Sequence, residues 1–244
     1  MTRVARAAAA AALLVVTLAG CAAIPHGPEP LPSSFIPDIT PSAPAAIDEV
    51  GGFTALERQA LRVRVRTCTA YGTGSAFAID ETHAVTNRHV VDGATNITLT
   101  GFDGKEYKGT SSVLARDADL ALITIDGTFP HLASLADAEP ATGDILTIAG
   151  YPNGEELAVR EGPFVAKVTD ELDNAPDPVY QLDAESHHGN SGSPVANAAG
   201  EIVGVLYASD DVHTSYVVGL ATLERFLDTL DEAKKNRADC EAQD

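Results

Sequence analysis

Three residues have the types that nucleophilic catalysis requires: His89, Asp119 and Ser191. A serine hydroxyl is a weak nucleophile at neutral pH unless an adjacent base takes its proton, and histidine is the usual base. A carboxylate can hold the imidazole in one tautomer and stabilise its protonated form. The chemistry expected of the three together is acyl transfer through Ser191, which needs neither a metal ion nor an organic cofactor.

The histidine and the aspartate each stand next to a predicted hydrophobic strand. His89 follows a predicted strand at residues 84–86, and Asp119 directly precedes one at residues 120–125. Asp117 is the alternative partner for the histidine, but it stands two residues farther from the strand. The sequence therefore favours Asp119.

The nucleophile lies between glycines in the segment GNSGSPV, residues 189–195. We expect the backbone amides of Gly189, Asn190 and Ser191 to surround the oxygen that becomes negative when Ser191 attacks a carbonyl group. A side chain at position 189 would crowd that carbonyl, so glycine suits the position.

Short strands must position these residues. Residues 62–66 and part of 96–100 alternate with period two, which is typical of half-buried strands. Strands at this spacing indicate an all-β barrel or sandwich. Thr54 and Glu57 can cap a short helix over residues 53–60, and apolar residues at helical spacing predict a C-terminal helix over residues 220–230. Further strands are predicted at residues 75–79, 84–86, 120–125, 145–149, 179–182, 202–207 and 216–219.

The N-terminus has the pattern of an export signal. Two arginines precede an apolar stretch at residues 7–18, which is short for a transmembrane helix. The stretch ends in LAGC, which resembles a bacterial lipobox and implies cleavage after residue 20 and a lipid anchor on Cys21. An ordinary signal peptide is the alternative. Residues 21–52 are rich in proline and are expected to be an extended linker between membrane and domain.

Two cysteines remain for the exported domain, Cys68 and Cys240. An even number of cysteines in an oxidising compartment predicts a disulfide between them, and two unpaired thiols are the alternative. The formal net charge of the whole chain is −19. Such a charge repels phosphate backbones, so we expect no nucleic-acid partner.

The motifs together resemble the trypsin-like peptidases of bacterial envelopes, the Deg/HtrA type in particular. The order His, Asp, Ser is that of chymotrypsin folds and differs from subtilisin and α/β-hydrolases. The resembling segments are GTGSAF at 72–77, TNRHVV at 86–91, DLAL at 119–122 and GNSGSP at 189–194.

The resemblance implies a chymotrypsin-like fold of two six-stranded antiparallel β-barrels, followed by a C-terminal α-helix. We expect an N-terminal barrel at residues 53–135 that carries His89 and Asp119, and a C-terminal barrel at residues 136–244 that carries Ser191. The expected substrate is a protein or peptide. No PDZ domain is expected after the helix, and no sequence feature specifies an oligomeric state.

The same resemblance suggests where a substrate binds. Tyr207, Ala208 and Ser209 are expected to form the strand that pairs with the substrate backbone. Glu185 stands six residues before the nucleophile, where trypsin-like enzymes place the base of the specificity pocket; an exposed position in solvent is the alternative. His187 and His188 are expected to line the pocket or face solvent rather than bind a metal ion, because no third ligand stands at a suitable spacing.

Three functions are compatible with these motifs: an envelope endopeptidase, a catalytically silent binding module and an esterase. The complete triad argues against the silent module. The esterase would need Gly at position 193, which is Ser193, and a later histidine, and His213 is too close to Ser191.

Overall fold

The structure describes most of the chain from residue 52 onwards. This computed structural model covers residues 52–170, 176–210, 212–238 and 240, all within the compact unit Ala45–Asp244. The signal segment, Cys21 and the linker up to residue 51 lie outside the described residues. Within the described ranges no helix has the length and apolar character needed to cross a bilayer.

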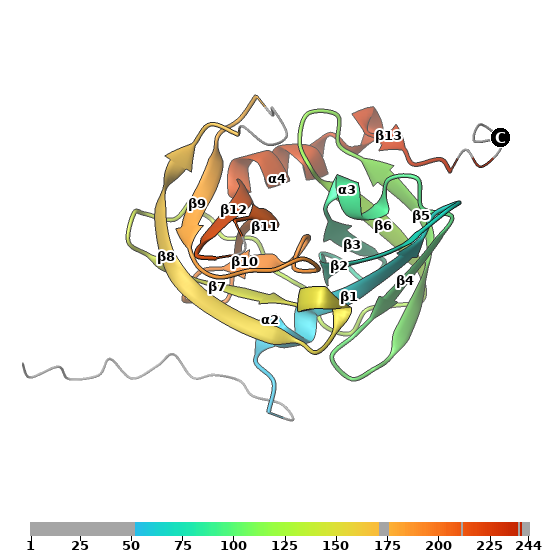
Figure 1. Cartoon of the computed structure of the whole chain (residues 1–244), viewed down its shortest axis with the longest axis horizontal. Helices are drawn as coiled ribbons and strands as arrows, with labels where there is room; N and C mark the ends of the chain where they lie inside the picture. The colour runs from blue at the N-terminus through green and yellow to red at the C-terminus, as the bar shows by residue number, and fades with distance from the viewer. Residues whose placement is uncertain (1–51, 171–175, 211, 239, 241–244) are drawn as a thin grey trace, which may run out of the picture. The chain divides into compact units, whose positions relative to one another are not determined.

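Six antiparallel strands close the first barrel (Figure 1). Strand β1 pairs with β2 and β4, and β6 closes the barrel by pairing with β3 and β5. The predicted alternation along β1 is confirmed, because Val63 and Val65 are buried while Arg64 and Arg66 are exposed. The strands are β1 Ala60–Arg66, β2 Tyr71–Ala78, β3 His83–Thr86, β4 Asn96–Thr100, β5 Glu106–Leu114 and β6 Ala121–Asp126.

The second barrel has the strand order β10-β11-β12-β9-β8-β7 and closes between β10 and β7. Its core contains Leu146, Ile148, Leu182 and Leu206, all at most 1% exposed. Its strands are β7 Ile145–Gly150, β8 Ala158–Val168, β9 Val179–Asp183, β10 Pro194–Ala196, β11 Ile202–Ser209 and β12 Thr214–Gly219.

The predicted all-β class with two six-stranded barrels is confirmed. Strands β5 and β8 and the two-residue β13 (Lys234–Lys235) were not predicted from the sequence. Strand β8 contains Gly162 and Pro163, which interrupt a strand pattern, but a Cβ at position 162 would stand 2.0 Å from the Asp183 carbonyl oxygen. That glycine is therefore required by the close approach of the next strand.

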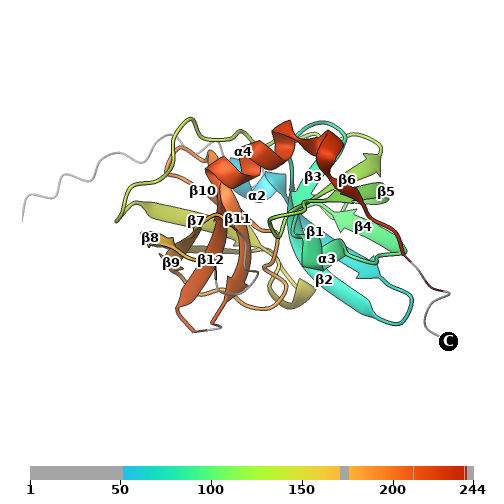
Figure 2. The same ribbon diagram turned by 90° about the horizontal axis from the view of Figure 1, so that it is seen from above.

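Short helices complete the unit. Helix α2 (Ala55–Gln59) has the predicted capping box, in which Thr54 and Glu57 exchange hydrogen bonds. Helix α4 (Leu220–Asp228) confirms the C-terminal helix, and its apolar side packs on both barrels (Figure 2). The remaining elements are α3 Arg88–Val91 and the 3₁₀ turns η2 Pro152–Gly154 and η3 Leu230–Glu232.

After α4 the chain returns to the first barrel. Strand β13 (Lys234–Lys235) adds to the edge of β5, and the Asn236 amide donates to the Val91 carbonyl oxygen at 2.7 Å. The disulfide predicted between Cys68 and Cys240 is present, with a Cα–Cα distance of 5.4 Å. It closes a loop of 172 residues, which the chain-entropy model values at about 5 kcal/mol.

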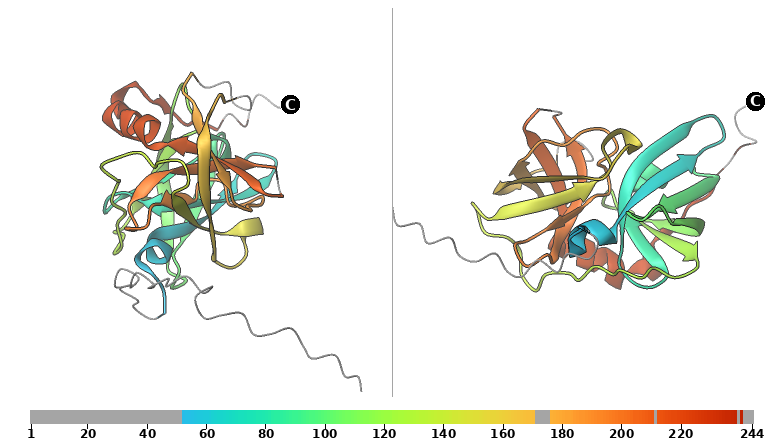
Figure 3. Two further views of the ribbon diagram at one scale, coloured as in Figure 1. Left: turned by 90° about the vertical axis from the view of Figure 1, so that its left-hand side faces the viewer. Right: turned by 90° about the horizontal axis from the view of Figure 1, so that it is seen from below.

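One buried serine joins the two barrels, which lie side by side (Figure 3). The Ser75 N–H donates to the Ser191 carbonyl oxygen at 2.7 Å, and the Ser75 hydroxyl donates to the Gly189 carbonyl oxygen at 2.9 Å. The same hydroxyl accepts the Tyr151 N–H at 2.9 Å. Because Ser75 is fully buried, no water can replace these bonds if the hydroxyl is removed.

We therefore predict that Ser75→Ala lowers the free energy of unfolding by roughly 2–4 kcal/mol, because it leaves two buried backbone groups without a partner. Ser193→Ala is the matched control: this serine is equally buried, but its hydroxyl has no hydrogen-bond partner within the described ranges. Chemical denaturation of both variants checks this. Equal losses in the two variants would contradict the role assigned to Ser75.

Candidate active site

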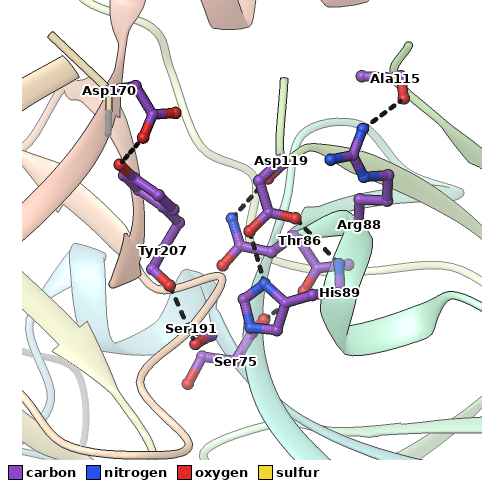
Figure 4. Close-up of polar contacts among 10 residues, drawn as sticks. Ser75, Thr86, Arg88, His89, Ala115, Asp119, Asp170, Ser191 and Tyr207 are labelled. Carbon is purple, nitrogen blue, oxygen red and sulfur yellow. Dashed lines mark hydrogen bonds and ion pairs between the residues drawn. The ribbon is translucent and has the colours of Figure 1, made fainter. Parts of the chain in front are cut away.

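The first barrel positions a histidine on a buried carboxylate (Figure 4). His89 Nδ1 lies 2.5 Å from Asp119 Oδ2, and the His89 N–H donates to Asp119 Oδ1 at 2.9 Å. The Asn87 amide donates to the Asp119 backbone carbonyl oxygen at 2.8 Å and fixes Asp119 two residues before β6. The Asp119 side chain is 6% exposed and that of His89 is 50% exposed, so the carboxylate is sealed while the outer edge of the imidazole is accessible.

The structure brings Asp119, and not Asp117, to the histidine. The Asp117 side chain is 56% exposed, and its carboxylate lies 3.9 Å from the Arg225 guanidinium. The strand that begins at Ala121 draws Asp119 inward, because the next residue, Leu120, is fully buried.

Ser191 enters the site from the second barrel. Its hydroxyl donates to the Tyr207 carbonyl oxygen at 3.4 Å, and within the described part of the chain it makes no hydrogen bond to His89 (Figure 4). Both side chains nevertheless line one cavity of about 250 Å³. The following Gly192 has φ of +90°, and a Cβ there would meet the Ser75 carbonyl oxygen at 1.9 Å. Ser191 is therefore presented by a turn that only glycine allows.

The turn before Ser191 fixes the direction of a peptide group. The Asn190 N–H donates to the His187 carbonyl oxygen at 3.0 Å, and Gly189 has φ of +93°, as the third residue of a type II turn requires. The His188 carbonyl oxygen accepts the Asn153 N–H at 2.6 Å. With that oxygen engaged, the N–H of Gly189 points the opposite way. Among the described residues, the amides of Gly189 and Ser191 have no partner, so both can bind an oxygen.

The cavity beside Ser191 contains most of the predicted pocket residues: His188, Tyr207, Ala208 and Ser209, together with His187. It does not include Glu185, whose half-exposed carboxylate pairs with His187 Nε2 at 3.0 Å. Glu185 therefore takes the alternative, exposed position: its side chain faces solvent, while its neighbours Ala184 and Ser186 are buried.

Apart from its three histidines, the cavity is lined by uncharged side chains. Ser186 Oγ and Ser215 Oγ lie 2.7 Å apart, and both serines are buried. Ser209 Oγ donates to the Ser186 carbonyl oxygen at 2.9 Å, which joins the cavity wall to strand β11. Across the described residues no group of three or more His, Cys, Asp or Glu side chains could hold a metal ion.

Two residues that support the site were not identified from the sequence, Ser75 and Asn153. Ser75 is part of the GTGSAF motif, and only the family resemblance drew attention to that motif. Asn153 has φ of 55°, the only positive φ of a non-glycine residue in the described ranges. Beside it, burial raises the pKa of the Tyr151 phenol to about 12, so the hydroxyl stays neutral and donates to the Ala60 carbonyl oxygen at 3.4 Å.

Solved structures share this fold. A crystal structure of the Rv3671c protease from M. tuberculosis, active form, is 24% identical, with a TM-score of 0.65 over 74% of this chain and 83% of that one. The HtrA-type protease AlgW with tripeptide is also 24% identical and has a TM-score of 0.65 over 73% and 62%. At this identity the likeness shows the fold.

Curated relatives and a family match extend the comparison. Serine protease Rv3671c of Mycobacterium tuberculosis is 29% identical over 62% of this chain and 40% of its own length. A probable periplasmic serine endoprotease, DegP-like, of Chlamydia pneumoniae is 35% identical over 55% of this chain and 28% of its own. The chain thus spans less than half the length of these relatives. The trypsin-like peptidase domain family matches residues 73–205, more than half of the sequence, and the chain belongs to that family.

Proposed function

We propose that the chain is a serine endopeptidase that cleaves peptide bonds of exported proteins. The observation that carries the proposal is the cavity shared by Ser191 and His89, where His89 rests 2.5 Å from a buried carboxylate. Both halves of the site come from segments that the family match covers. The serine protease names of the relatives agree with this activity.

In the proposed mechanism His89 Nε2 accepts the Ser191 hydroxyl proton as Oγ attacks the substrate carbonyl carbon. For this step the hydroxyl rotates from the Tyr207 carbonyl oxygen towards His89. Asp119 accepts the Nδ1–H bond and stabilises the imidazolium that forms. His89 then protonates the leaving amine, an acyl-enzyme remains on Ser191, and a water activated by His89 releases it.

The amides of Gly189 and Ser191 would bind the negative oxygen of the tetrahedral intermediate. Asn190, between them, uses its own N–H to close the turn, so its role is to shape the site. The bond from Asn153 to the His188 carbonyl oxygen supports this assignment, because it holds the peptide before Gly189 with its N–H free. Preorganised donors of this kind cost no reorganisation during the reaction.

The pocket chemistry favours a neutral side chain before the cleaved bond. Ser186, Leu206 and Ala208 form a small, uncharged wall, and no carboxylate stands among the described residues that line the cavity. A preference for Lys or Arg through Glu185 therefore has no support from the geometry. Strand residues 207–209 are proposed to pair with the substrate backbone.

Fluorophosphonate labelling tests the nucleophile. The full-length protein should be labelled, and Ser191→Ala should lose labelling and more than about a thousandfold of kcat, because the attacking oxygen is gone. Ser193→Ala is the matched control, since it removes a buried hydroxyl two residues away and should keep labelling. A folded protein that resists the probe would favour the silent binding module, in which Ser191 stays on the Tyr207 carbonyl oxygen.

A second variant tests the oxygen-binding amides. A Cβ at position 189 would stand 2.6 Å from the Asn153 nitrogen, so Gly189→Ala must displace the turn. We expect kcat to fall about 100- to 1000-fold. Gly200→Ala is the control, because Gly200 also has a positive φ, +80°, but has open space around it. Peptide hydrolysis and melting temperature measured together check this; unchanged kcat in Gly189→Ala would refute the assignment.

We also propose that the protein is exported and anchored by a lipid on Cys21, as the lipobox pattern LAGC implies. The periplasmic naming of the DegP-like relatives agrees with an extracytoplasmic location. Cells that make the protein should incorporate an alkyne-labelled fatty acid into it, and Cys21→Ser should abolish the label. Membrane association that persists in the unlabelled variant would show another mode of attachment.

A further inference from the structure

A row of arginines follows the outward face of β1, next to the candidate active site. Arg62, Arg64 and Arg66 alternate with the buried Val63 and Val65. The whole chain has only 16 Lys and Arg against 35 Asp and Glu. Even so, within the described ranges none of the three guanidinium groups has a carboxylate within 4.0 Å. The charges of Arg64 and Arg66, both exposed, are therefore available to a ligand.

Arg64, the middle arginine of the row, lines an open groove of about 360 Å³. Its lining includes Arg64, Tyr71, Thr73, Asn153 and His188, and no acidic side chain. The strand register sets Arg64 beside Thr73, and Arg66 beside Tyr71. The Arg66 guanidinium lies 5.8 Å from the centre of the Tyr71 ring, which is 82% exposed. This aromatic contact holds Arg66 at the rim of the groove.

The groove lies next to the cavity that Ser191 lines. The two hollows share one lining residue, His188. Strand β2 leads from one to the other: Ser75 bonds to the Ser191 backbone, Gly74 packs against it, and Thr73 lines the groove. Since residues 207–209 are proposed to hold the substrate before the cleaved bond, the residues after that bond would leave Ser191 over His188 and enter the groove.

Arg62 has a different task. Its guanidinium lies 5.9 Å from the centre of the Tyr151 ring and donates to the Glu155 carbonyl oxygen at 3.3 Å. It is therefore engaged in the loop that carries Asn153. The two arginines free to bind substrate are Arg64 and Arg66, both of them exposed.

We propose that Arg64, assisted by Arg66, makes the enzyme prefer peptides with acidic side chains shortly after the cleaved bond. This proposal rests on the endopeptidase activity proposed above and defines its substrate class. A guanidinium can bind a carboxylate with two parallel hydrogen bonds, which a neutral amide cannot match. On an exposed surface the preference for Glu over Gln should be about 3- to 30-fold in kcat/KM.

The test uses internally quenched peptides that are identical before the cleaved bond and carry Glu, Gln or Lys at the second and third positions after it. The wild-type protein should cleave the Glu peptide fastest, and Arg64→Gln should remove most of the difference between Glu and Gln. Arg64→Glu should favour the Lys peptide. Raising NaCl to about 0.5 M should weaken the preference by screening.

Two controls isolate the groove. A substrate whose leaving group is 4-nitroaniline has no residue to enter it, so Arg64→Gln should cleave that substrate at the wild-type rate. Arg160→Gln removes the same charge from an exposed position on β8 and should keep the preference for Glu. If the wild-type protein hydrolyses the anilide but cleaves the Glu and Gln peptides equally fast, the groove proposal is wrong and the endopeptidase proposal stands.

Binding separates this proposal from the catalytic one. Ser191→Ala should bind the Glu peptide more tightly than the Gln peptide in fluorescence anisotropy, and adding Arg64→Gln should make the two affinities equal. If the wild-type protein neither reacts with fluorophosphonate nor cleaves any substrate, the endopeptidase proposal fails, and equal affinities would then reject the groove as well. An Arg64→Gln variant that loses binding to phosphatidylglycerol vesicles, with peptide preference intact, would assign the arginines to a lipid surface and overturn the proposal.

Discussion

The hydrogen bonds of Ser75 are the constraint on which the rest of the site depends. The proposed reaction needs a base from one barrel and a nucleophile from the other, and hydrophobic packing between barrels has no direction that could set their relative position. Ser75 supplies the direction. Its N–H and hydroxyl hold the backbone of Ser191 and Gly189, while its carbonyl oxygen accepts the Thr86 hydroxyl at 2.7 Å, three residues before His89. One fully buried residue thus links both halves of the site.

The second barrel makes the complementary contribution. Tyr151 donates its N–H to the Ser75 hydroxyl, and Asn153, two residues later, holds the His188 carbonyl oxygen. The loop between β7 and β8 therefore controls the peptide before Gly189 as well as the contact between barrels. Its left-handed conformation at Asn153 has an energetic cost. The surrounding hydrogen bonds offset that cost, and within the described residues they leave the amides of Gly189 and Ser191 without a hydrogen-bond partner.

The sequence predicted what depends on near neighbours and missed what depends on distant ones. His89 and Asp119 could be assigned because each stands at the end of a hydrophobic strand, and the capping box of Thr54 and Glu57 lies within four residues. Ser75 could not be assigned in this way, since its hydroxyl partner Gly189 is 114 positions away. Glu185 shows the same limit: a count along the chain assumes which way a side chain points, and the Glu185 side chain is half exposed and pairs with His187.

The C-terminal segment returns to the first barrel through contacts between residues that are distant in the sequence. These contacts restrain the strands beside the groove. Cys68 stands in the turn between β1 and β2, the two strands that carry Arg64 and Tyr71, and its bridge to Cys240 ties the far end of that hairpin to the segment after β13. Strand β1 is paired on both sides up to Arg66, but residues 71–74 of β2 pair with β1 alone, so the bridge in the adjoining turn restrains the open edge of β2. A ligand that bound a mobile hairpin would have to order it, at a cost in affinity. The disulfide therefore does more than stabilise the domain: it restrains the strand pair that, in the proposed binding mode, would face the residues after the cleaved bond.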